Sequence, residues 1–588
     1  MLKCPESTAC FRAFNPDSDW NVRLKKPFAT RLARDLDEVR EVVAFADQAS
    51  RRGAWVALAL AYEAAPAFDS AMAVPAAGVG RVLAWAAAFA ADQAERNFSS
   101  RLGAGGDYRV GSWRPRLSAA AYQEAIARIH RRIAAGDTYQ VNYTFGLDSA
   151  FDGDAGAWFD DLRAAQQADF CALLNLPDGL LISLSPELFF RRDGDLLTCR
   201  PMKGTSRRGR FADEDRELAG QLSACRKNRA ENLMIVDLLR NDLGRIARSG
   251  TVQVPALFEV ERFRTVLQMT STVQARVGRE LSLSRILEAL FPCGSITGAP
   301  KISTMRIIRD LETGPRGFYT GAVGFVKPGG DCVFNVPIRT VAVDKVSGRA
   351  TCHVGGGVTA DSTAAGEYDE ALLKAAFLTA PPPDFCLLET MLLEGGDWFL
   401  AKRHECRLRE AAEYFRFPLA HQELLETLAG LRSAHPHGRW KVRLLLDPEG
   451  RLHGESEELP GSAVAEAPLR VGLASDPVDE ADPFLFHKTT RRDLYRQARQ
   501  RRPDCDEVIL WNRQGEATEA CAYNLVVEID GRKWTPPVAC GLLPGTFRAE
   551  LLSCGEIGER VIALDELGRA DRLWLINSVR KWRPARLV

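Results

Sequence analysis

Residues 355 to 374 have the sequence GGGVTADSTAAGEYDEALLK. Three consecutive glycines precede an expected helix that opens on carboxylates. On this helix Glu367, Glu370 and Lys374 stand at i, i+3 and i+7, so they project from one face. Acidic side chains also suit a helix N-terminus, and a Glu–Lys pair four residues apart is common on exposed helices. The spacing alone therefore allows either a binding site or an ordinary solvated surface.

A second acidic helix is expected over residues 227 to 242, where Glu231 precedes an apolar stripe. Two such helices can bring Glu231, Glu367 and Glu370 to one hard cation. Mg²⁺ is commonly held by one or two carboxylates together with water and an anionic substrate, so three carboxylates would suffice. Spacing leaves open whether the three converge.

The clearest boundary is the sequence APPPD at residues 380 to 384. Consecutive prolines lack N–H donors and favour extended geometry, which suits a short stiff linker. We therefore predict a front module at 1 to 380, a proline linker at 381 to 384, and a rear module at 385 to 588 that folds separately.

Both modules mix the two kinds of periodicity, which predicts an α+β fold class. Expected front helices lie at 119 to 135 and 229 to 239, with an alanine-rich helix at 84 to 94. Expected front strands lie at 180 to 184, 321 to 326 and 333 to 343. In the rear module, strands are expected at 440 to 446 and 524 to 529, and helices at 490 to 502 and 548 to 552.

Composition excludes several functions. The 77 basic and 77 acidic side chains cancel, so no overall field recruits nucleic acid. The apolar stretches are too short to span a membrane, and the N-terminus lacks the apolar core of a signal peptide. Fourteen cysteines without a CxxC pair are typical of free thiols in a reducing compartment. We expect a cytoplasmic protein without nucleic-acid or membrane partners.

Ordered motifs run through the front module: YEAAPAFD at 62 to 69, GDTYQVN at 136 to 142, SPELFF at 185 to 190, RPMKGT at 200 to 205, ENLMIVDLLRNDLGRI at 231 to 246, FPCGSITGAPK at 291 to 301, IRT at 338 to 340, and the glycine-helix segment. In this order they resemble the chorismate-utilising enzymes, specifically aminodeoxychorismate synthases. The resemblance implies stacked antiparallel sheets flanked by helices. It also implies chorismate as substrate, a cyclohexadiene with two carboxylates and a C4 hydroxyl that must leave.

The same resemblance assigns roles to the residues that bind chorismate. Mg²⁺ on Glu231, Glu367 and Glu370 would neutralise one carboxylate. The groups implied to hold the carboxylates are Arg339, Lys374 and backbone donors around Gly204, Thr205, Gly355, Gly356 and Gly357.

Chemical roles follow for two further residues. Glu187 resembles the general acid of the family, and it serves only while protonated, which requires a raised pKa. Lys203 resembles the amine that adds to the ring before ammonia displaces it, and it attacks only while neutral. Anthranilate synthases commonly have alanine at the position of Lys203, so lysine favours amination at C4.

Two glutamines refine the expectation. Isochorismate and salicylate synthases typically place a water-activating lysine where Gln140 stands, so nitrogen rather than water is the expected nucleophile. Gln268 replaces a histidine that many relatives carry beside the leaving hydroxyl, and an amide cannot relay a proton. Nothing in the chain resembles a glutamine amidotransferase, so ammonia is expected from solution or from a separate glutaminase subunit.

The rear module centres on FLFHKTTRRDLY at 484 to 495, where Lys488 follows apolar residues and Thr489 or Thr490 is placed to cap a helix. An isolated lysine of this kind usually lies on the surface. Its companions are LLETMLL at 387 to 393, HECRLREAAEYFRFP at 404 to 418, EATEACAYNLVVE at 516 to 528, GLLPGTFR at 541 to 548 and NSVRKWRP at 577 to 584. Together these resemble fold-type IV pyridoxal-phosphate enzymes, most of all aminodeoxychorismate lyase.

This second resemblance implies that Lys488 bonds to pyridoxal phosphate and that Glu519 pairs with the pyridine nitrogen. Arg407 would grip the phosphate, together with the helix start at Gly545 and Thr546 and with Ser578. Thr390 is assigned to proton transfer, and the fold allows a homodimer through the rear module.

The joint hypothesis is a bifunctional enzyme. The front module would make 4-amino-4-deoxychorismate, and the rear module would eliminate pyruvate to leave 4-aminobenzoate, a folate precursor. The alternatives are an anthranilate synthase-like front module, and a rear module that is an amino-acid aminotransferase or a non-catalytic scaffold.

Overall fold

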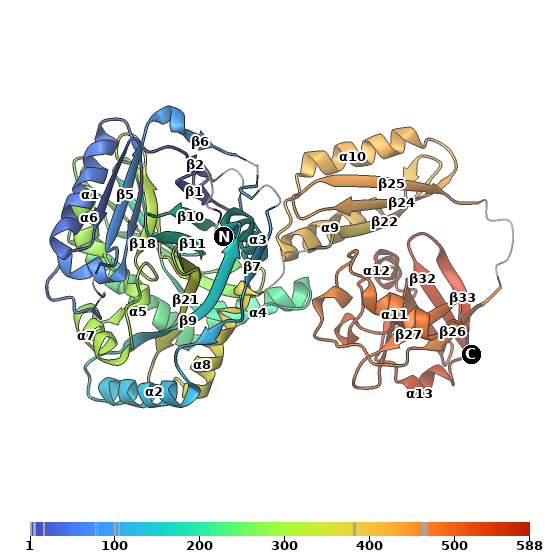
Figure 1. The fold of residues 1–588 in the computed structure, drawn as a ribbon. Coiled ribbons are helices and arrows are strands. Elements are labelled where there is room, and N and C mark those ends of the chain that lie inside the picture. Colours follow the sequence, from blue (N-terminus) through green and yellow to red (C-terminus); the bar gives the residue numbers. More distant parts are fainter. Residues whose placement is uncertain are drawn as a thin grey trace. The chain divides into compact units, whose positions relative to one another are not determined.

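A computed structural model describes residues 3, 7–15, 18–76, 78, 80–98, 101–103, 106–379, 384–460 and 467–588. The chain divides into two compact units (Figure 1). The front unit comprises Met1–Arg207 with Ala219–Pro382, and the rear unit comprises Arg208–Leu218 with Pro383–Val588. Of the expected proline linker, residues 381 to 383 lie outside the described residues.

Two antiparallel sheets form the centre of the front unit in the described part of the chain. The first has the order β17 (Gly298–Ala299), β9 (Gln140–Gly153), β21 (Arg349–Val358), β20 (Thr340–Asp344), β11 (Gly179–Ser185), β10 (Phe170–Asn175), β1 (Ala9–Arg12), β2 (Val22–Leu24) and β6 (Ala94–Arg96), with β7 (Tyr108–Val110) and β8 (Arg114–Pro115) on β9. The second has the order β14 (Met202–Arg207), β16 (Val266–Arg276), β13 (Leu196–Arg200), β12 (Leu188–Asp193), β19 (Cys332–Asn335), β18 (Ala322–Val326), β4 (Trp55–Leu60), β5 (Ala84–Phe89) and β3 (Ala29–Ala33), with β15 (Gln253–Arg262) on β16.

The two sheets pack face to face across an aromatic core. Phe11 and Trp20, from the first sheet and the loop beside it, meet Trp55 and Phe325 of the second. The Trp20 indole N–H donates to the carbonyl of Cys171 (2.7 Å), so its polar atom is satisfied inside the core.

Strands β4 and β5 are buried on both faces, which explains their uninterrupted apolar sequence. On β5, Trp85 and Phe89 point into the core between the sheets, while Ala84, Ala86 and Ala88 face the helices on the other side. The predicted helix at 84 to 94 is therefore wrong. Alanine favours helices weakly, and burial on two faces outweighs that preference.

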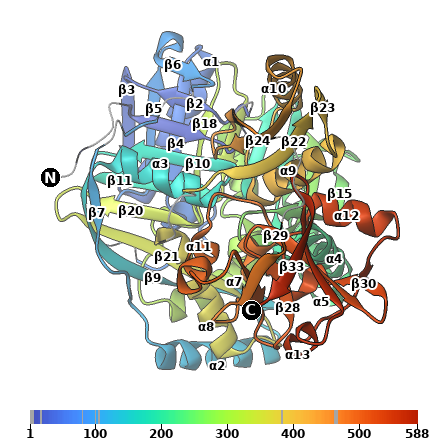
Figure 2. The same ribbon diagram turned by 90° about the vertical axis from the view of Figure 1, so that its right-hand side faces the viewer.

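Helices cover the outer face of each sheet. Against the second sheet pack α1 (Leu36–Arg51), α5 (Arg226–Gly244) and α6 (Leu283–Leu290). Against the first pack α2 (Ala119–Ala134), α3 (Ala155–Gln166), α7 (Lys301–Leu311) and α8 (Ala364–Leu373). Figures 1 and 2 both show α2 and α8 side by side. The unit is thus layered helix, sheet, sheet, helix, as the family resemblance implied.

The strand expected at 333 to 343 is two strands in different sheets. β19 ends at Asn335 and β20 begins at Thr340. Between them Arg339 has a φ of 50°, a left-handed conformation that is costly for a non-glycine residue. β19 is buried throughout, whereas β20 is exposed at Ala342 and Asp344, so the run joins two strands with different surroundings.

The rear unit contains two further sheets. The smaller has the order β23 (Asp397–Trp398), β22 (Leu387–Glu394), β24 (Arg439–Leu446) and β25 (Leu452–Glu458), and α9 (Ala401–Phe415) and α10 (His421–Ala434) pack on it. The larger has the order β28 (Ala517–Ala520), β27 (Glu507–Trp511), β26 (Leu469–Leu473), β33 (Lys581–Leu587), β32 (Arg572–Asn577), β29 (Tyr523–Ile529), β30 (Arg532–Thr535) and β31 (Gly558–Glu559). The remaining rear helices are α11 (Asp493–Arg501), α12 (Thr546–Ser553) and α13 (Leu564–Leu567).

A short segment from the front half of the sequence completes the rear unit. Arg208–Leu218 includes the first part of α4 (Ala212–Ala224). The Arg208 guanidinium forms a buried two-bond pair with Asp215 (2.8 and 3.0 Å) and lies over the ring of Tyr414. Phe211 packs against Phe486. No proline-rich or glycine-rich linker in the sequence marks where the chain enters the rear unit at Arg208 or leaves it after Leu218.

None of the helices in the described ranges is long and apolar enough to cross a lipid bilayer. The 13 cysteines of the described part are all free thiols, which agrees with the expected absence of a disulfide framework.

Candidate active sites

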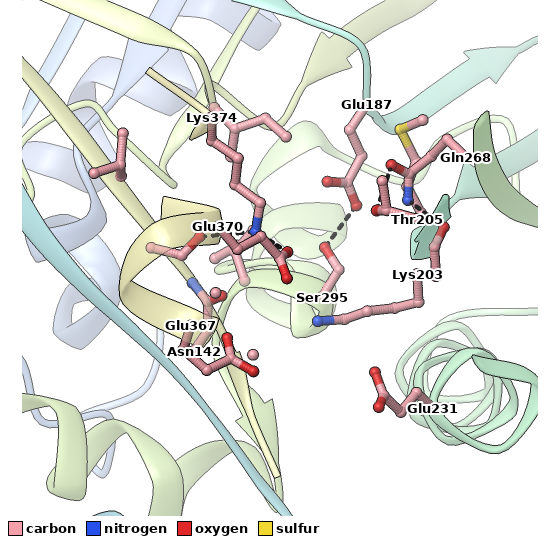
Figure 3. Close-up of a pocket in the computed structure, with 18 of the residues that line it drawn as sticks. Asn142, Glu187, Lys203, Thr205, Glu231, Gln268, Ser295, Glu367, Glu370 and Lys374 are labelled. Atoms are coloured by element: carbon pink, nitrogen blue, oxygen red, sulfur yellow. Dashed lines mark hydrogen bonds and ion pairs between the residues drawn. The ribbon is translucent and has the colours of Figure 1, made fainter. Parts of the chain in front are cut away.

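The front unit encloses a cavity of about 260 Å³ between the ends of its two sheets. Most of the predicted front-site residues line it: Glu187, Lys203, Gly204, Thr205, Glu231, Gln268, Arg339, Gly355, Gly356, Gly357, Glu367, Glu370 and Lys374. They come from β14, β16, β21, α5, α8 and the loops after β11 and before β20. Figure 3 shows Lys203 extending into this cavity, with Glu187, Ser295 and Glu231 around it.

Glu187 lies in the turn between β11 and β12 and is 3% exposed. Ser295 Oγ donates to Oε1 of Glu187 (2.6 Å), and a further hydroxyl–thiol contact joins Ser295 to Cys293 (3.2 Å). Burial raises the pKa of Glu187 to about 7, against the lowering effects of Ser295 and Lys203. The carboxyl group is thus held near the point where it can give up a proton at neutral pH.

Lys203 lies on β14, and the next residue, Gly204, has a φ of +94°. Burial lowers the pKa of Lys203, although Glu231 opposes the shift, and the positive charge of Lys374 lowers the pKa further. A larger fraction of the amine is therefore neutral than for an exposed lysine. The site holds an acid and an amine whose pKa values are pushed toward each other.

The three predicted metal ligands face the same cavity but are not gathered as ligands. No group of three or more acidic, histidine or cysteine side chains in the described residues is close enough to hold a metal ion. Glu370 pairs with Lys374 (2.9 Å), and Glu367 accepts from Ser362 Oγ (2.7 Å). Burial raises the pKa of Glu231, and the charges of Glu367 and Glu370 add to this rise. A divalent cation would relieve that repulsion, although the three carboxylates are too far apart in this arrangement to coordinate one ion together.

The two predicted carboxylate-binding cations have different surroundings. Lys374 Nζ bridges Glu370 and the carbonyl of Gly355 (3.0 Å), and this ion pair lowers the pKa of Glu370 although burial alone would raise it. Arg339 Nη1 donates to Gln166 Oε1 (2.7 Å), and burial lowers the pKa of Arg339 to about 10. No acidic side chain neutralises Arg339 among the contacts described for it.

The glycine trio on β21 is required by close approach. A Cβ at Gly355 would overlap the carbonyl of Tyr143 on β9, and one at Gly356 would lie 2.8 Å from Glu367 Oε2. At Gly357 a Cβ would overlap Nε2 of Gln140 and lie 2.9 Å from Lys203 Nζ. Gln140 therefore lies behind Gly357, fully buried and not among the residues that line the cavity, and neither atom of its amide has a hydrogen-bond partner among the described residues.

Gln268 lines the cavity, but its amide holds β14. Nε2 donates to the carbonyl of Gly204 (2.9 Å), and Oε1 accepts from Thr205 Oγ1 (3.1 Å). These bonds fix the strand that carries Lys203. The structure thus gives Gln268 a positioning contact within the protein, which the sequence comparison with histidine did not suggest.

Sequence reasoning missed several lining residues, among them Ser295, Asn142, Tyr319 and His353. Ser295 belongs to a motif that was noticed, yet its partner Glu187 is 108 residues away and no local spacing links them. The ring of His353 stacks on Tyr319 (centroids 5.5 Å apart), and burial lowers the pKa of His353 to about 3, so this imidazole is neutral.

The rear unit encloses a larger cavity of about 600 Å³. Every predicted rear-site residue lines it: Thr390, Arg407, Lys488, Glu519, Gly545, Thr546 and Ser578. They come from β22, α9, the loop before α11, β28, the start of α12, and the turn between β32 and β33.

Lys488 lies in a loop anchored to the start of β22. Its carbonyl accepts from the Leu388 N–H (2.9 Å), and Thr490 exchanges hydrogen bonds with Cys386. The threonines therefore do not cap α11, which begins at Asp493 without a side-chain cap. Burial and the nearby Arg407 charge lower the pKa of Lys488 to about 8. Such an amine is partly neutral at physiological pH, as bonding to a carbonyl carbon requires.

Glu519 on β28 is buried beside two neutral donors. The Tyr495 hydroxyl donates to Oε1 (2.9 Å) and Asn524 Nδ2 to Oε2 (3.4 Å). Burial raises the pKa of Glu519 to about 8. The positive charges of Arg492 and Lys488 lower the pKa of Glu519 against this rise, so the carboxyl group lies among cations in the same cavity.

The start of α12 forms an anion cradle. Gly545 is the N-cap of this helix, and a Cβ there would overlap the side chain of Asn524. Thr546 follows at the first helical position, and Arg407 Nη1 donates to the Pro544 carbonyl (3.3 Å) beside it. Free N–H groups and the helix dipole favour a phosphate here, so these residues fit pyridoxal phosphate.

Further cations line the rear cavity and were not singled out from the sequence: Lys441, Arg443, Arg492, Arg496, Arg499 and Arg580. Lys441 pairs with Glu457 and Arg443 with Glu455 on the neighbouring strand. Alternation along β24 places these two cations on one face. The overall charge balance of the chain conceals this local excess.

Comparison with known proteins bears on both cavities. The family described as chorismate binding enzyme matches residues 6–380, and the class IV amino-transferase family matches residues 386–588. Aminodeoxychorismate synthase component 1 of Salmonella typhimurium is 40% identical over 270 residues, 46% of this chain and 59% of that protein. Anthranilate synthase component 1 of Streptomyces coelicolor is 38% identical over 276 residues, 47% of this chain and 54% of that protein.

Among solved structures, anthranilate synthase component I from Streptococcus pneumoniae TIGR4 has a TM-score of 0.54 at 23% identity, over 64% of this chain and 94% of that chain. This likeness concerns the fold alone. The chain spans less than two thirds of the length of the two curated relatives. The matches confirm the α+β class and both family resemblances. Residues 386–588 match the class IV amino-transferase family, and the chain belongs to the family of chorismate binding enzymes.

Proposed function

We propose that the front unit replaces the C4 hydroxyl of chorismate with an amino group, and that the rear unit releases pyruvate from the product to give 4-aminobenzoate. The observation that carries the front assignment is the pairing of Glu187 and Lys203 in one cavity, with the pKa of the carboxyl raised and the pKa of the amine lowered.

Glu187 is the proposed general acid. Hydroxide is a poor leaving group, and protonation by Glu187 lets the C4 oxygen depart as water. The Ser295 hydroxyl bond to Oε1 holds the carboxyl in one orientation. This role agrees with a pKa of about 7, because much of the group is then protonated near neutral pH.

Lys203 is the proposed nucleophile. Its lone pair forms a C–N bond to the ring as the C4–O bond breaks, and ammonia then forms the C4–N bond while Lys203 leaves with its electron pair. One water is released and one ammonia is consumed. Gln268, which fixes β14, keeps the amine directed into the cavity.

Binding of the two carboxylates is assigned to Arg339 and Lys374, with backbone donors of β14 and β21. Mg²⁺ on Glu231, Glu367 and Glu370 would neutralise charge on the substrate when bound. All three carboxylates line the same cavity, and the charges of Glu367 and Glu370 raise the pKa of Glu231, which supports this donor set.

Product identity tests the front assignment. Chorismate, Mg²⁺ and an ammonium salt, without pyridoxal phosphate, should give 4-amino-4-deoxychorismate, identified by NMR. Formation of anthranilate would assign amination at C2, and isochorismate would assign water as the nucleophile. Either product would overturn the proposal.

For the rear unit we propose a lyase that uses pyridoxal phosphate. The cofactor, when bound, supplies an electron sink for the bond changes at the substrate. Lys488 Nζ, with a pKa lowered to about 8, accepts the C4 proton while the C3–O bond breaks. The enolpyruvate that leaves takes up a proton to become pyruvate. Glu519 would pair with the ring nitrogen of the bound cofactor, and Thr390 is assigned to the proton path.

Assays with and without 2-oxoglutarate distinguish elimination from transamination in the rear unit. With 4-amino-4-deoxychorismate alone, the lyase should release one pyruvate per 4-aminobenzoate. Dependence on 2-oxoglutarate, with glutamate as a product, would instead identify an aminotransferase. A rear unit that binds no cofactor, with the same absorption spectrum as Lys488→Ala, would be a scaffold.

The ammonia source and location are also proposed. The names of the relatives pair a component 1 with another component, which supports a separate glutamine amidotransferase subunit. Free thiols support a reducing cytoplasm, and the rear fold allows a homodimer. Stimulation of 4-aminobenzoate formation by glutamine only in the presence of such a subunit would test the partner.

A further inference from the structure

A buried carboxylate outside the predicted site organises the rear phosphate cradle. Glu389 on β22 is 1% exposed. Its Oε1 accepts from Arg407 Nε (2.8 Å), and its Oε2 accepts from Arg407 Nη2 (2.7 Å). His404 Nδ1 lies 2.7 Å from the same Oε2. Glu389 thus binds two side chains of α9 at once.

This arrangement decides which hydrogens of Arg407 remain for a ligand. A guanidinium has five N–H groups in a fixed plane. Glu389 takes the pair on the Nε and Nη2 edge, and the Pro544 carbonyl takes one on Nη1 (3.3 Å). One hydrogen on Nη1 and one on Nη2 remain to be donated to the oxygens of a phosphate.

His404 extends the same alignment to the helix start. The ring is 1% exposed, and burial lowers its pKa, so Nδ1 carries the proton that is donated to Glu389. Nε2 is then an acceptor and lies 3.2 Å from Thr546 Oγ1. The Thr546 hydroxyl proton is directed to His404, and the N–H at the start of α12 is left for the cradle.

The network stays charged over the working range of pH. Burial alone would raise the pKa of Glu389, but Arg407 and His404 lower it to about 2. A permanently ionised carboxylate holds the guanidinium in one plane and prevents rotation away from the cradle. It also offsets the charge of Arg407, which would otherwise be costly to bury.

We propose that Glu389, acting through Arg407 and His404, is the positioning residue of the phosphate subsite in the rear cavity. The proposal rests on the assignment of pyridoxal phosphate to that cavity. Glu389 itself does not line the cavity. Its effect should appear in the recognition of the phosphate and not in recognition of the rest of the cofactor.

The test compares two ligands that differ only in the phosphate. Dissociation constants for pyridoxal phosphate and pyridoxal are measured by absorption titration of the full-length protein, for the wild type, Glu389→Gln and Glu389→Asp. The aspartate keeps the charge one methylene further back. In both variants the preference for the phosphorylated ligand should fall about tenfold or more, because an ionic anchor of Arg407 is weakened. Affinity for pyridoxal should change little.

A matched control is Glu559→Gln, which removes the carboxylate partner of another buried arginine in the same unit, Arg548. Neither residue lines the cavity, and the preference should stay at the wild-type value. In an Arg407→Met background, Glu389→Gln should cause a smaller further loss of preference than in the wild type, because only the contact through His404 remains to be lost.

Different outcomes distinguish a failure of the cofactor assignment from a failure of the positioning role of Glu389. A wild type that does not prefer pyridoxal phosphate over pyridoxal would overturn the cofactor assignment itself. A wild-type preference retained in both Glu389 variants would overturn the positioning role. Equal loss of affinity for both ligands would also overturn it, since Glu389 would then support only the fold.

Discussion

The front cavity depends on two residues whose pKa values move in opposite directions. Burial raises the pKa of Glu187 and lowers that of Lys203, because each becomes harder to ionise away from water. Either shift alone is common in buried sites. Their occurrence in one cavity gives an acid and an amine that can act at the same pH.

Replacing Lys203 tests the amine. Lys203→Ala should lower kcat for amination by about a hundredfold or more, because the covalent route is lost, while chorismate binding largely survives. Steady-state kinetics and a separate binding titration measure the two effects. Lys227, which also lines the cavity, provides the control, since Lys227→Ala should change KM more than kcat. Normal turnover of Lys203→Ala would exclude a covalent lysine.

The pH dependence tests the acid. Glu187 donates a proton only while protonated, so the rate should fall as pH rises through its pKa of about 7. Lys203 needs to be neutral, so the opposite limb should rise with pH. Glu187→Gln should lower kcat by about 10²–10⁴ and remove the limb near pH 7. A variant that keeps that limb would assign it to another group.

Residue identities were largely accessible from the sequence, because ordered motifs carry them. The contacts that tune them were not. Ser295 lies 108 residues from Glu187, and Glu389 lies 18 residues from Arg407 on a different element. Sequence spacing reports neighbours on one helix or strand, whereas these pairs form only when separate elements pack together.

At the scale of elements, β21 lines the front cavity with three consecutive glycines, Gly355 to Gly357. Its glycines let α8 on one side and Gln140 with Lys203 on the other approach the strand. The strand is therefore both a wall of the cavity and a spacer.

Adding a single methyl group to β21 tests this role. In Gly357→Ala the new Cβ would overlap Gln140 and crowd Lys203 Nζ at 2.9 Å, so the amine should be displaced and amination should fall. Gly278→Ala is the control, because a Cβ there meets nothing within 4 Å. Kinetics and thermal unfolding of both variants are compared. Equal activity of the two would show that the space at Gly357 is not needed.

Elements that were mispredicted share one cause. β5 (Ala84–Phe89) and β19 (Cys332–Asn335) are buried on both faces, so neither shows the alternation that identifies a half-exposed strand. Hydrophobic periodicity identifies a strand where one face of that strand is exposed to solvent. On a strand that is buried on both faces, periodicity does not separate strand from helix.

At the scale of the whole molecule, the two units are not continuous in sequence. Arg208–Leu218 belongs to the rear unit although it follows directly on β14, the strand of Lys203. A chain cut at the proline run would therefore leave the rear unit without this segment. The boundary predicted from the sequence assigned Arg208–Leu218 to the front module.

Substitution of Arg208 tests the contribution of the segment. Arg208→Ala removes a two-bond partner from the buried Asp215 and a cation from the face of Tyr414. The free energy of unfolding should fall by about 3–5 kcal/mol. Arg216→Ala removes an exposed pair with Asp213 and should cost about 1 kcal/mol or less. Equal unfolding midpoints for the two variants would contradict a structural role for the segment.

The central claim is that one chain carries out two consecutive steps. The most direct measurement is the product stoichiometry from chorismate, Mg²⁺, an ammonium salt and pyridoxal phosphate. The account predicts one 4-aminobenzoate and one pyruvate per chorismate consumed, with 4-amino-4-deoxychorismate accumulating in Lys488→Ala. Production of anthranilate and pyruvate, unchanged in Lys488→Ala, would contradict it.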